Sequence, residues 1–115
     1  MDKSSSEKEA FIKIENSTFG LAITALKAGK RAYRASWKNN DTLPWIVYMS
    51  ELNLPPYDTQ GTERKVNDRT ARWIGKDKPL NSKAYIAFWD GNTYWQPGWT
   101  PSQEDMLAED WHIID

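Results

Sequence analysis

Cysteine is absent from this chain of 115 residues, and histidine occurs only once. Without cysteine there is no disulfide, no thiolate nucleophile and no zinc–thiolate site. The single histidine, His112, lies between Trp111 and Ile113, where a structural strand residue is a commoner role than a general base. A glycine-rich phosphate loop with a lysine is also missing. We therefore expect no catalytic residue, no metal and no cofactor.

Long apolar runs are lacking as well. No stretch approaches the roughly 20 residues of a membrane span, and no signal-peptide core follows Met1. The net charge is −1, so the chain lacks the excess of positive charge typical of nucleic-acid or anionic-membrane binding. We expect a cytoplasmic protein that binds neither a nucleic-acid polymer nor a membrane.

Aromatic residues, in contrast, are abundant: seven Trp, five Tyr and three Phe. A core of this size can use several of them, so the others are expected to be partly exposed, at an interface or under a ligand. The length fits one domain. We expect a flexible N-terminal extension over residues 1–16 and a single domain over residues 17–115, with a variable insertion at about 50–80.

The order of apolar patterns and turn signals predicts an α+β fold with a small antiparallel sheet. Ser17-Thr18 caps a helix whose apolar residues recur at helical spacing, and Gly29 ends it. Strand patterns follow at residues 30–35, 43–49, 85–89, 93–96 and 110–114, residues 11–14 are a candidate edge strand, and a turn at 36–41 presents Trp37. A short helix precedes the last strand.

Two of these strands, Leu43–Met49 and Tyr85–Trp89, are apolar on both alternating sets of side chains. This pattern is typical of a sheet that is covered on both faces. The N-terminal helix can cover one face, and we expect a second subunit on the other, in a homodimer or homotetramer. The alternative is that the insertion folds back over this face.

The insertion, Ser50–Leu80, is interrupted by proline and glycine. Within it, Thr62–Trp73 predicts a basic amphipathic helix; its cations are Arg64, Lys65, Arg69 and Arg72. The pair Arg72-Trp73 combines a guanidinium with an indole, which suits phosphate binding and base stacking. A solvated helix whose Trp73 packs on the sheet is the alternative interpretation.

The stretch Gly98–Trp111 is the most sharply specified part of the chain. Thr100 is a candidate N-cap, Pro101 suits the first helical position, and acidic residues fill the first turn. We expect Met106, Leu107 and Ala108 to form the apolar side of this helix. Adjacent carboxylates at 104–105 and 109–110 are interpreted as partners of the helix dipole and of a turn.

These residues favour a pocket for a phosphorylated ligand that carries a base. The candidate aromatic faces are Trp37, Trp73 and Trp99, and the candidate cations are Arg34 and Arg72, although a surface ion pair is the commoner fate of Arg34. The candidate hydrogen-bonding groups are Ser102, Gln103, Asp105 and the backbone amides at the helix start, with Asp105 suited to ribose hydroxyls.

Two motifs resemble one known family when they are taken together. They are T-F-G-L-A-I-T-A-L-K-A-G-K-R-A-Y-R-A-S-W (Thr18–Trp37) and G-W-T-P-S-Q-E-D-M-L-A-E-D-W (Gly98–Trp111). The chain is similar to the Thoeris anti-defence 2-like proteins of phages and prophages. The resemblance covers residues 18–114, and members vary in length around 50–80. Ser36 and Pro101 stand where family members usually have Gly and Ala.

The resemblance implies a compact α+β subunit that assembles into a homotetramer in the cytoplasm of the bacterial host. It also implies that the protein sequesters cyclic nucleotide immune signals without cleaving them: a cyclic ADP-ribose isomer and, for some members, cyclic dinucleotides. The family positions fall on Arg34, Trp37, Trp99, Ser102, Gln103 and Asp105; Trp73 rests on the chemical argument alone. The alternatives are a protein-binding inhibitor of a host defence factor and a cyclic-nucleotide hydrolase.

Overall fold

The computed structural model describes residues 13–115, which divide into two compact units. The first unit contains the residues up to Met49 and from Tyr85 to Asp115, and the second contains Ser50–Ala84. The second unit thus falls where the sequence places an insertion. Of the candidate edge strand over residues 11–14, Phe11 and Ile12 lie outside the described residues, and the described part enters a strand at Ile14. None of the described helices is long and apolar enough to cross a membrane.

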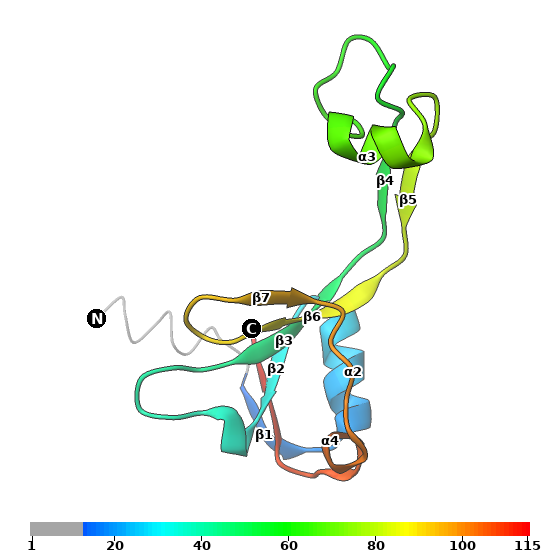
Figure 1. The fold of residues 1–115 in the computed structure, drawn as a ribbon. Coiled ribbons are helices and arrows are strands. Elements are labelled where there is room, and N and C mark those ends of the chain that lie inside the picture. The colour runs from blue at the N-terminus through cyan, green and yellow to red at the C-terminus, as the bar shows by residue number, and fades with distance from the viewer. Residues whose placement is uncertain (1–12) are drawn as a thin grey trace, which may run out of the picture. The chain divides into compact units, whose positions relative to one another are not determined.

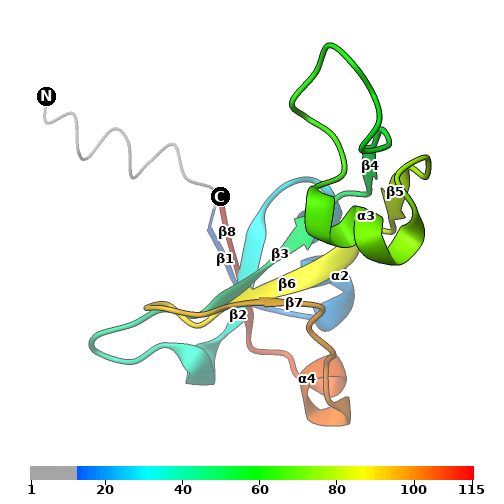
Figure 2. The same ribbon diagram turned by 45° about the horizontal axis from the view of Figure 1, so that its top comes forward.

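The first unit is built on a six-stranded antiparallel sheet, in the order β1–β8–β2–β3–β6–β7 (Figure 1). The strands are β1 (Ile14–Ser17), β2 (Arg31–Arg34), β3 (Trp45–Met49), β6 (Tyr85–Trp89), β7 (Trp95–Pro97) and β8 (Trp111–Ile114). The last strand lies inside the sheet, with β1 on one side (Figure 2) and β2 on the other. The predicted α+β class and antiparallel sheet are confirmed.

Helix α2 (Phe19–Lys27) packs against the sheet, and capping hydrogen bonds fix where it begins and ends. The Thr18 hydroxyl accepts a hydrogen bond from the amide of Leu21 at 3.2 Å. At the other end Gly29 has φ +90°, and the amides of Gly29 and Lys30 donate to carbonyls of the last turn. Both predicted caps of this helix are therefore confirmed.

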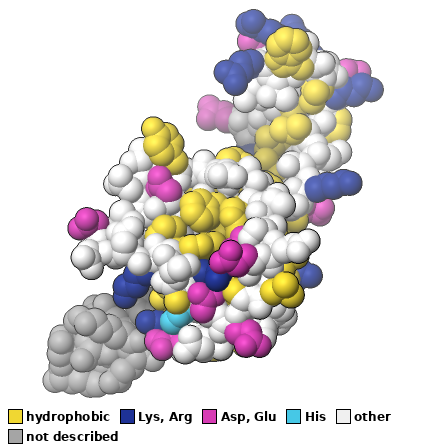
Figure 3. Space-filling model, turned by 60° about the horizontal axis from the view of Figure 1, so that its bottom comes forward, with side chains coloured by type: hydrophobic (Ala, Val, Ile, Leu, Met, Phe, Trp, Pro, Cys, Tyr) yellow, Lys and Arg dark blue, Asp and Glu magenta, His cyan; other side chains and the backbone are white. Residues whose placement is uncertain are grey.

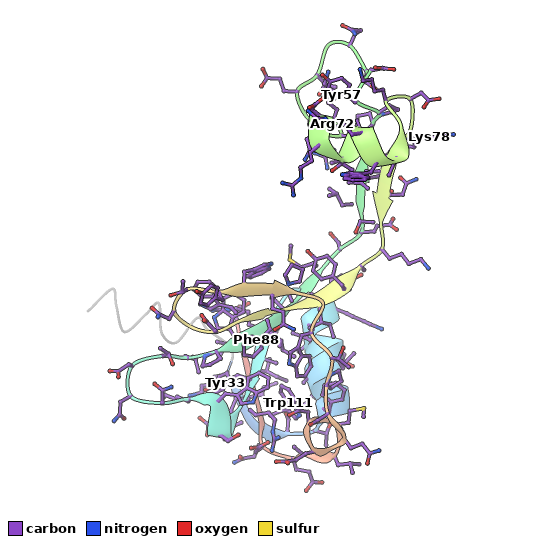
Figure 4. All side chains as sticks on the ribbon, in the orientation of Figure 1. Tyr33, Tyr57, Arg72, Lys78, Phe88 and Trp111 are labelled. Carbon is purple, nitrogen blue, oxygen red and sulfur yellow. The ribbon has the colours of Figure 1, made fainter. Side chains whose placement is uncertain are left out.

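The core of the first unit lies between α2 and one face of the sheet. Its fully buried members are Ala22, Leu26, Ala32, Ile46, Trp111 and Ile113, with Ala25 almost buried. The register explains this set, because Ala32 on β2 lies opposite both Ile46 on β3 and Ile113 on β8, so that all three side chains point to the same face. Trp111 is the largest buried side chain (Figure 4).

The opposite face of the sheet carries a second group of aromatic rings. Trp45 pairs with Trp89, which pairs with Trp95, so the three indoles stand in a row across β3, β6 and β7. On β2 and β8, the Tyr33 and His112 rings stack with centroids 5.1 Å apart. His112 lies in the last strand, as expected, and the view that its role is structural stays a prediction. The subunit expected on this face stays a prediction.

The hairpin between β6 and β7 confirms the turn predicted at Asp90-Gly91-Asn92. One carboxylate oxygen of Asp90 accepts hydrogen bonds from the amides of Asn92, Thr93 and Tyr94 at 2.8 to 3.0 Å. These bonds, led by that from Asn92, hold the pKa of Asp90 below its ordinary value, against a smaller opposing effect of desolvation.

The second unit contains a two-stranded sheet, β4 (Leu52–Leu54) with β5 (Leu80–Ser82), and helix α3 (Asp68–Ile74). The predicted helix over 62–73 is wrong at its start, because Asn67 caps the helix by accepting from the amide of Thr70 at 2.8 Å. Arg64 and Lys65 therefore precede the helix. They belong to a loop that is fixed by the bond from the Val66 amide to the Pro55 carbonyl.

Candidate functional site

The polar end of the candidate site is the start of helix α4 (Gln103–Leu107). Ser102 caps this helix: its hydroxyl accepts from the amide of Asp105 at 3.0 Å, and the Asp105 carboxylate accepts from the amide of Ser102 at 2.9 Å. The prediction that Thr100 is the N-cap and Pro101 the first helical residue is wrong. The reciprocal capping box begins two residues later, because it satisfies two backbone amides at once.

Arg34, at the end of β2, joins this helix start to the sheet. Its Nε donates to Asp110 at 3.0 Å and its Nη1 donates to Asp105 at 3.1 Å, with Glu104 at 3.5 Å. The side chain of Arg34 is only 13% exposed, that of Asp105 16% and that of Asp110 32%. Arg34 is therefore already paired with carboxylates of its own chain. The ion pair expected as the commoner role of Arg34 is therefore present, and it is partly buried.

The electrostatics of this cluster follow from these contacts. The hydrogen bond to Asp110 raises the pKa of Arg34 above its ordinary value, although burial opposes the rise. Burial alone would raise the pKa of Asp105, but the hydrogen bonds from Ser102 and Arg34 bring it below its ordinary value. Three carboxylates thus surround one guanidinium, so the cluster is negative and disfavours a phosphate group.

The aromatic part of the site is a set of indoles stacked edge to face on Trp111. Trp37 lies 5.3 Å and Trp99 6.3 Å from Trp111 between ring centroids, and 5.8 Å from each other. Phe88 on β6 lies 5.4 Å from Trp37. Trp37 and Trp99 are partly buried, whereas Trp111 is fully buried. The two outer rings therefore stand on a rigid aromatic base.

A single hydrogen bond connects the aromatic and polar parts. The indole Nε1 of Trp111 donates to the backbone carbonyl of Asp105 at 2.8 Å. In addition, the amide of Ala35 donates to the carbonyl of Asp110 at 3.1 Å. Helix α4 lies beside the start of α2 (Figure 1). The position of α4 is thus fixed against both the sheet and α2.

The structure brings six of the seven predicted site residues into one neighbourhood: Arg34, Trp37, Trp99, Ser102, Gln103 and Asp105. Ser102 and Gln103 are exposed. The seventh, Trp73, belongs to the second unit and is 85% exposed. Arg72 beside it pairs with Asp68 at 3.0 Å. Its role in ligand binding stays a prediction.

Two further features differ from what the sequence analysis expects. Met106 and Leu107, expected on the apolar side of the helix, are 45% and 80% exposed, whereas Ala108 packs at the core.

On the other sheet face, the Trp45 ring lies 6.4 Å from Trp89 and 6.1 Å from Trp95, with the Arg31 guanidinium 5.3 Å from the centroid of the Trp45 ring. The hairpin register could have revealed this group, because a turn at residues 90–94 sets Trp89 opposite Trp95.

This arrangement is suited to holding a flat, polar molecule. The indoles offer apolar surface, and the exposed Ser102 and Gln103 offer hydrogen-bonding groups. In the described part of the chain, no group of three or more His, Asp or Glu side chains is placed to hold a metal ion.

Comparison with known proteins gives the class of protein to which this site belongs. Residues 17–114 match the model of the Thoeris anti-defense 2-like domain, and the chain belongs to this family. It is 28% identical over 97 residues to Thoeris anti-defense 2 of Bacillus phage SP01, an alignment that covers 84% of this chain and 93% of that protein. The family and this phage relative indicate an anti-defence role.

Proposed function

We propose that the protein binds and sequesters a cyclic nucleotide immune signal without cleaving it. A cyclic ADP-ribose isomer is the first candidate ligand, and cyclic dinucleotides are the second. The observation that carries this proposal is the juxtaposition of the Trp37 and Trp99 rings, held on buried Trp111, with the exposed polar groups of Ser102 and Gln103. Base stacking on an indole contributes about 1–3 kcal/mol.

The state of the nearby carboxylates supports binding rather than cleavage. Asp105 and Asp110 both accept hydrogen bonds from Arg34, and the lowered pKa of Asp105 makes its carboxylate a poor proton acceptor at neutral pH. A general base for hydrolysis needs a pKa close to the working pH. The hydrogen bonds of Asp105 and Asp110 instead favour a role in positioning the start of α4.

The negative charge around Arg34 bears on how the ligand would lie. We expect the base and ribose to contact the indoles and the exposed polar groups, and the phosphates to lie away from Glu104, Asp105 and Asp110. Cations contributed by a second copy would then neutralise the phosphates. Burial of the ligand between copies would also slow its release, which a sequestering protein requires.

Self-association is the second part of the proposal. The sheet face that carries Trp45, Trp89 and Trp95 is an apolar surface of the kind found in subunit interfaces, and Trp95 is 41% exposed. We propose that a second copy covers it, in a homodimer or homotetramer. Native mass spectrometry would give the subunit number and the mass of any ligand retained.

Isothermal titration with cyclic ADP-ribose isomers and cyclic dinucleotides tests the binding. We expect a Kd in the nanomolar range for one of them, which corresponds to about 12 kcal/mol. The ligand recovered by heating the complex should be chemically intact. Affinities no tighter than micromolar across this panel, or a ligand converted to product with turnover, would refute the proposal.

Gln103→Ala is the sharpest variant, because Gln103 is exposed and its loss should leave the fold intact. We expect it to weaken binding about tenfold, which is the loss of one hydrogen bond of about 1.4 kcal/mol. Gln60→Ala removes the same side chain from an exposed position in the second unit and should leave affinity unchanged. Equal affinities of both variants would remove Gln103 from the site.

A further inference from the structure

Helix α3 displays an exposed apolar centre with basic residues around it. Trp73 is 85% exposed and Ile74 38% exposed. Arg69 lies one helical turn before Trp73, Arg72 precedes it, and Lys76 follows the helix. We call these five residues the basic surface. Figure 3 shows hydrophobic side chains on this unit with Lys and Arg, and also Asp and Glu, beside them, and Figure 4 labels Arg72 on α3.

Helix α4 displays the opposite pattern. Met106 is 45% and Leu107 80% exposed, and carboxylates border them on both sides in the sequence. The side chain of Glu104 is 84% exposed, and Glu109 is also exposed. We call Glu104, Met106, Leu107 and Glu109 the acidic surface. No Lys or Arg occurs between Gly98 and Trp111, so the charge of this segment is negative throughout.

The charges of the two units follow the same division. Residues 50–84 contain seven Lys or Arg and five Asp or Glu, a net charge of +2, whereas the whole chain has −1. The remaining residues therefore carry −3. Copies of this chain thus present oppositely charged parts to one another, which steers association.

We propose that the basic surface of one copy docks on the acidic surface of a second copy. Each surface has exposed apolar side chains, and a Trp that is 85% exposed is uncommon in folded proteins. Docking would bury Trp73 against Met106 and Leu107, while Arg69 faces Glu109. Arg72 and Glu104, which pair with Asp68 and Arg34 within one copy, would add contacts across the interface. Pairing a basic surface with another basic surface would bring like charges together, so the complementary pairing is favoured.

This contact rests on the self-association that the proposed function includes, but it requires neither a ligand nor the sheet face that carries Trp45. It gives a role to the exposed side chains of Trp73, Met106 and Leu107, which the candidate site does not use. Trp73 is then an anchor between copies rather than a wall of the ligand pocket. Such anchors, an aromatic ring beside arginine, are the residues that carry most of the energy in protein interfaces.

Cross-linking tests the contact, because the chain has no native cysteine. Ile74→Cys and Met106→Cys each place one thiol on a surface while leaving Trp73 and Leu107 in place. A mixture of the two variants, treated with a short bis-maleimide, should give the mixed covalent dimer at least tenfold faster than a mixture of Ile74→Cys with Lys38→Cys, an exposed control position. Equal rates would overturn the proposal.

The chain that carries both cysteines separates docking between copies from docking within one chain. Cross-links should join two chains and become rarer on dilution; a cross-link that forms within one chain at every concentration would overturn the proposal.

Charge reversal gives a second test, read by sedimentation. Arg69→Glu and Glu109→Lys should each weaken association about tenfold, and a mixture of the two variants should restore it. Association that is unchanged in both variants would also overturn it.

Discussion

The ion pairs of Arg34 allow a direct test of what holds the candidate site in place. Arg34→Gln keeps a polar side chain but shortens it and removes the charge. The variant leaves Asp105 and Asp110, which are 16% and 32% exposed, without their cation. It should therefore destabilise the fold and loosen the start of α4.

The structure sets the size of this effect. A hydrogen bond to a charged partner contributes about 1.5–3 kcal/mol, and Arg34 makes two good ones, at 3.0 and 3.1 Å. Partial exposure of both carboxylates screens these contacts, so less than their sum is lost. We expect the free energy of unfolding to fall by about 2 kcal/mol, a large share of the 5–15 kcal/mol typical of a domain.

Arg72→Gln is the matched control. Arg72 also lies 3.0 Å from an aspartate, Asp68, but the two side chains are 73% and 54% exposed. An exposed helical pair of this kind contributes only about 0.3–0.5 kcal/mol. The two variants therefore remove the same chemical contact from a partly buried and from an exposed setting.

Urea unfolding followed by tryptophan fluorescence is the assay. Six of the seven tryptophans belong to the first unit, where Arg34 lies, so the fluorescence reports mainly on that unit. Circular dichroism is recorded on the same samples, because it also reads the helix and the strands of the second unit, where Arg72 lies. If Arg34→Gln costs no more than about 0.5 kcal/mol above the control, burial does not strengthen this ion pair. The view of Arg34 as the residue that positions α4 would then be wrong.

Three further predictions follow from local geometry. The pKa of Asp105 is lower in the folded protein than its ordinary value of 3.8. The ionised carboxylate therefore stabilises the fold above pH 3.8, and this stabilisation is lost as the pH falls through the folded pKa. In acid titrations of stability, Asp105→Asn should lose less stability than the unmodified protein. Gly91→Ala should destabilise by roughly 2–3 kcal/mol, because its Cβ would lie 2.9 Å from the backbone of Leu43 at φ +89°. Gly98→Ala, in the same unit and at φ +79° with open space, should cost about 1 kcal/mol by the same urea assay. Ser102→Ala should cost about 1 kcal/mol, and an unchanged midpoint would contradict the capping role.

The parts of the fold that the sequence predicts well are those fixed by local chemistry. Helix α2 begins after Thr18 and ends before Gly29, because a hydroxyl and a left-handed glycine satisfy its terminal groups within a few residues. Strand β6 has its predicted bounds, Tyr85–Trp89, and the hairpin turn at Asp90 closes as expected. In each case the deciding contacts lie close together in the chain.

The mistaken helix starts come from competition between two local signals. Proline at 101 suits a first helical position, but Ser102 and Asp105 form a reciprocal pair of hydrogen bonds that a Thr100 cap would not give. In the second unit the basic residues from Arg64 onward suggest a longer helix than Asn67 allows. Side chains that satisfy backbone amides override residue propensity in both segments.

The chemical character of the site depends on contacts that no local pattern reveals. Arg34 and Asp110 are 76 positions apart, and they meet because β2 pairs with β8, which sets Arg34 opposite Trp111. The sequence therefore leaves open whether the guanidinium of Arg34 binds a phosphate or pairs with carboxylates, and the folded chain pairs it with carboxylates. If the proposed cyclic nucleotide binds here, a group other than Arg34 must hold its phosphates. In our proposal a second copy supplies that positive charge, so that ligand capture would depend on self-association.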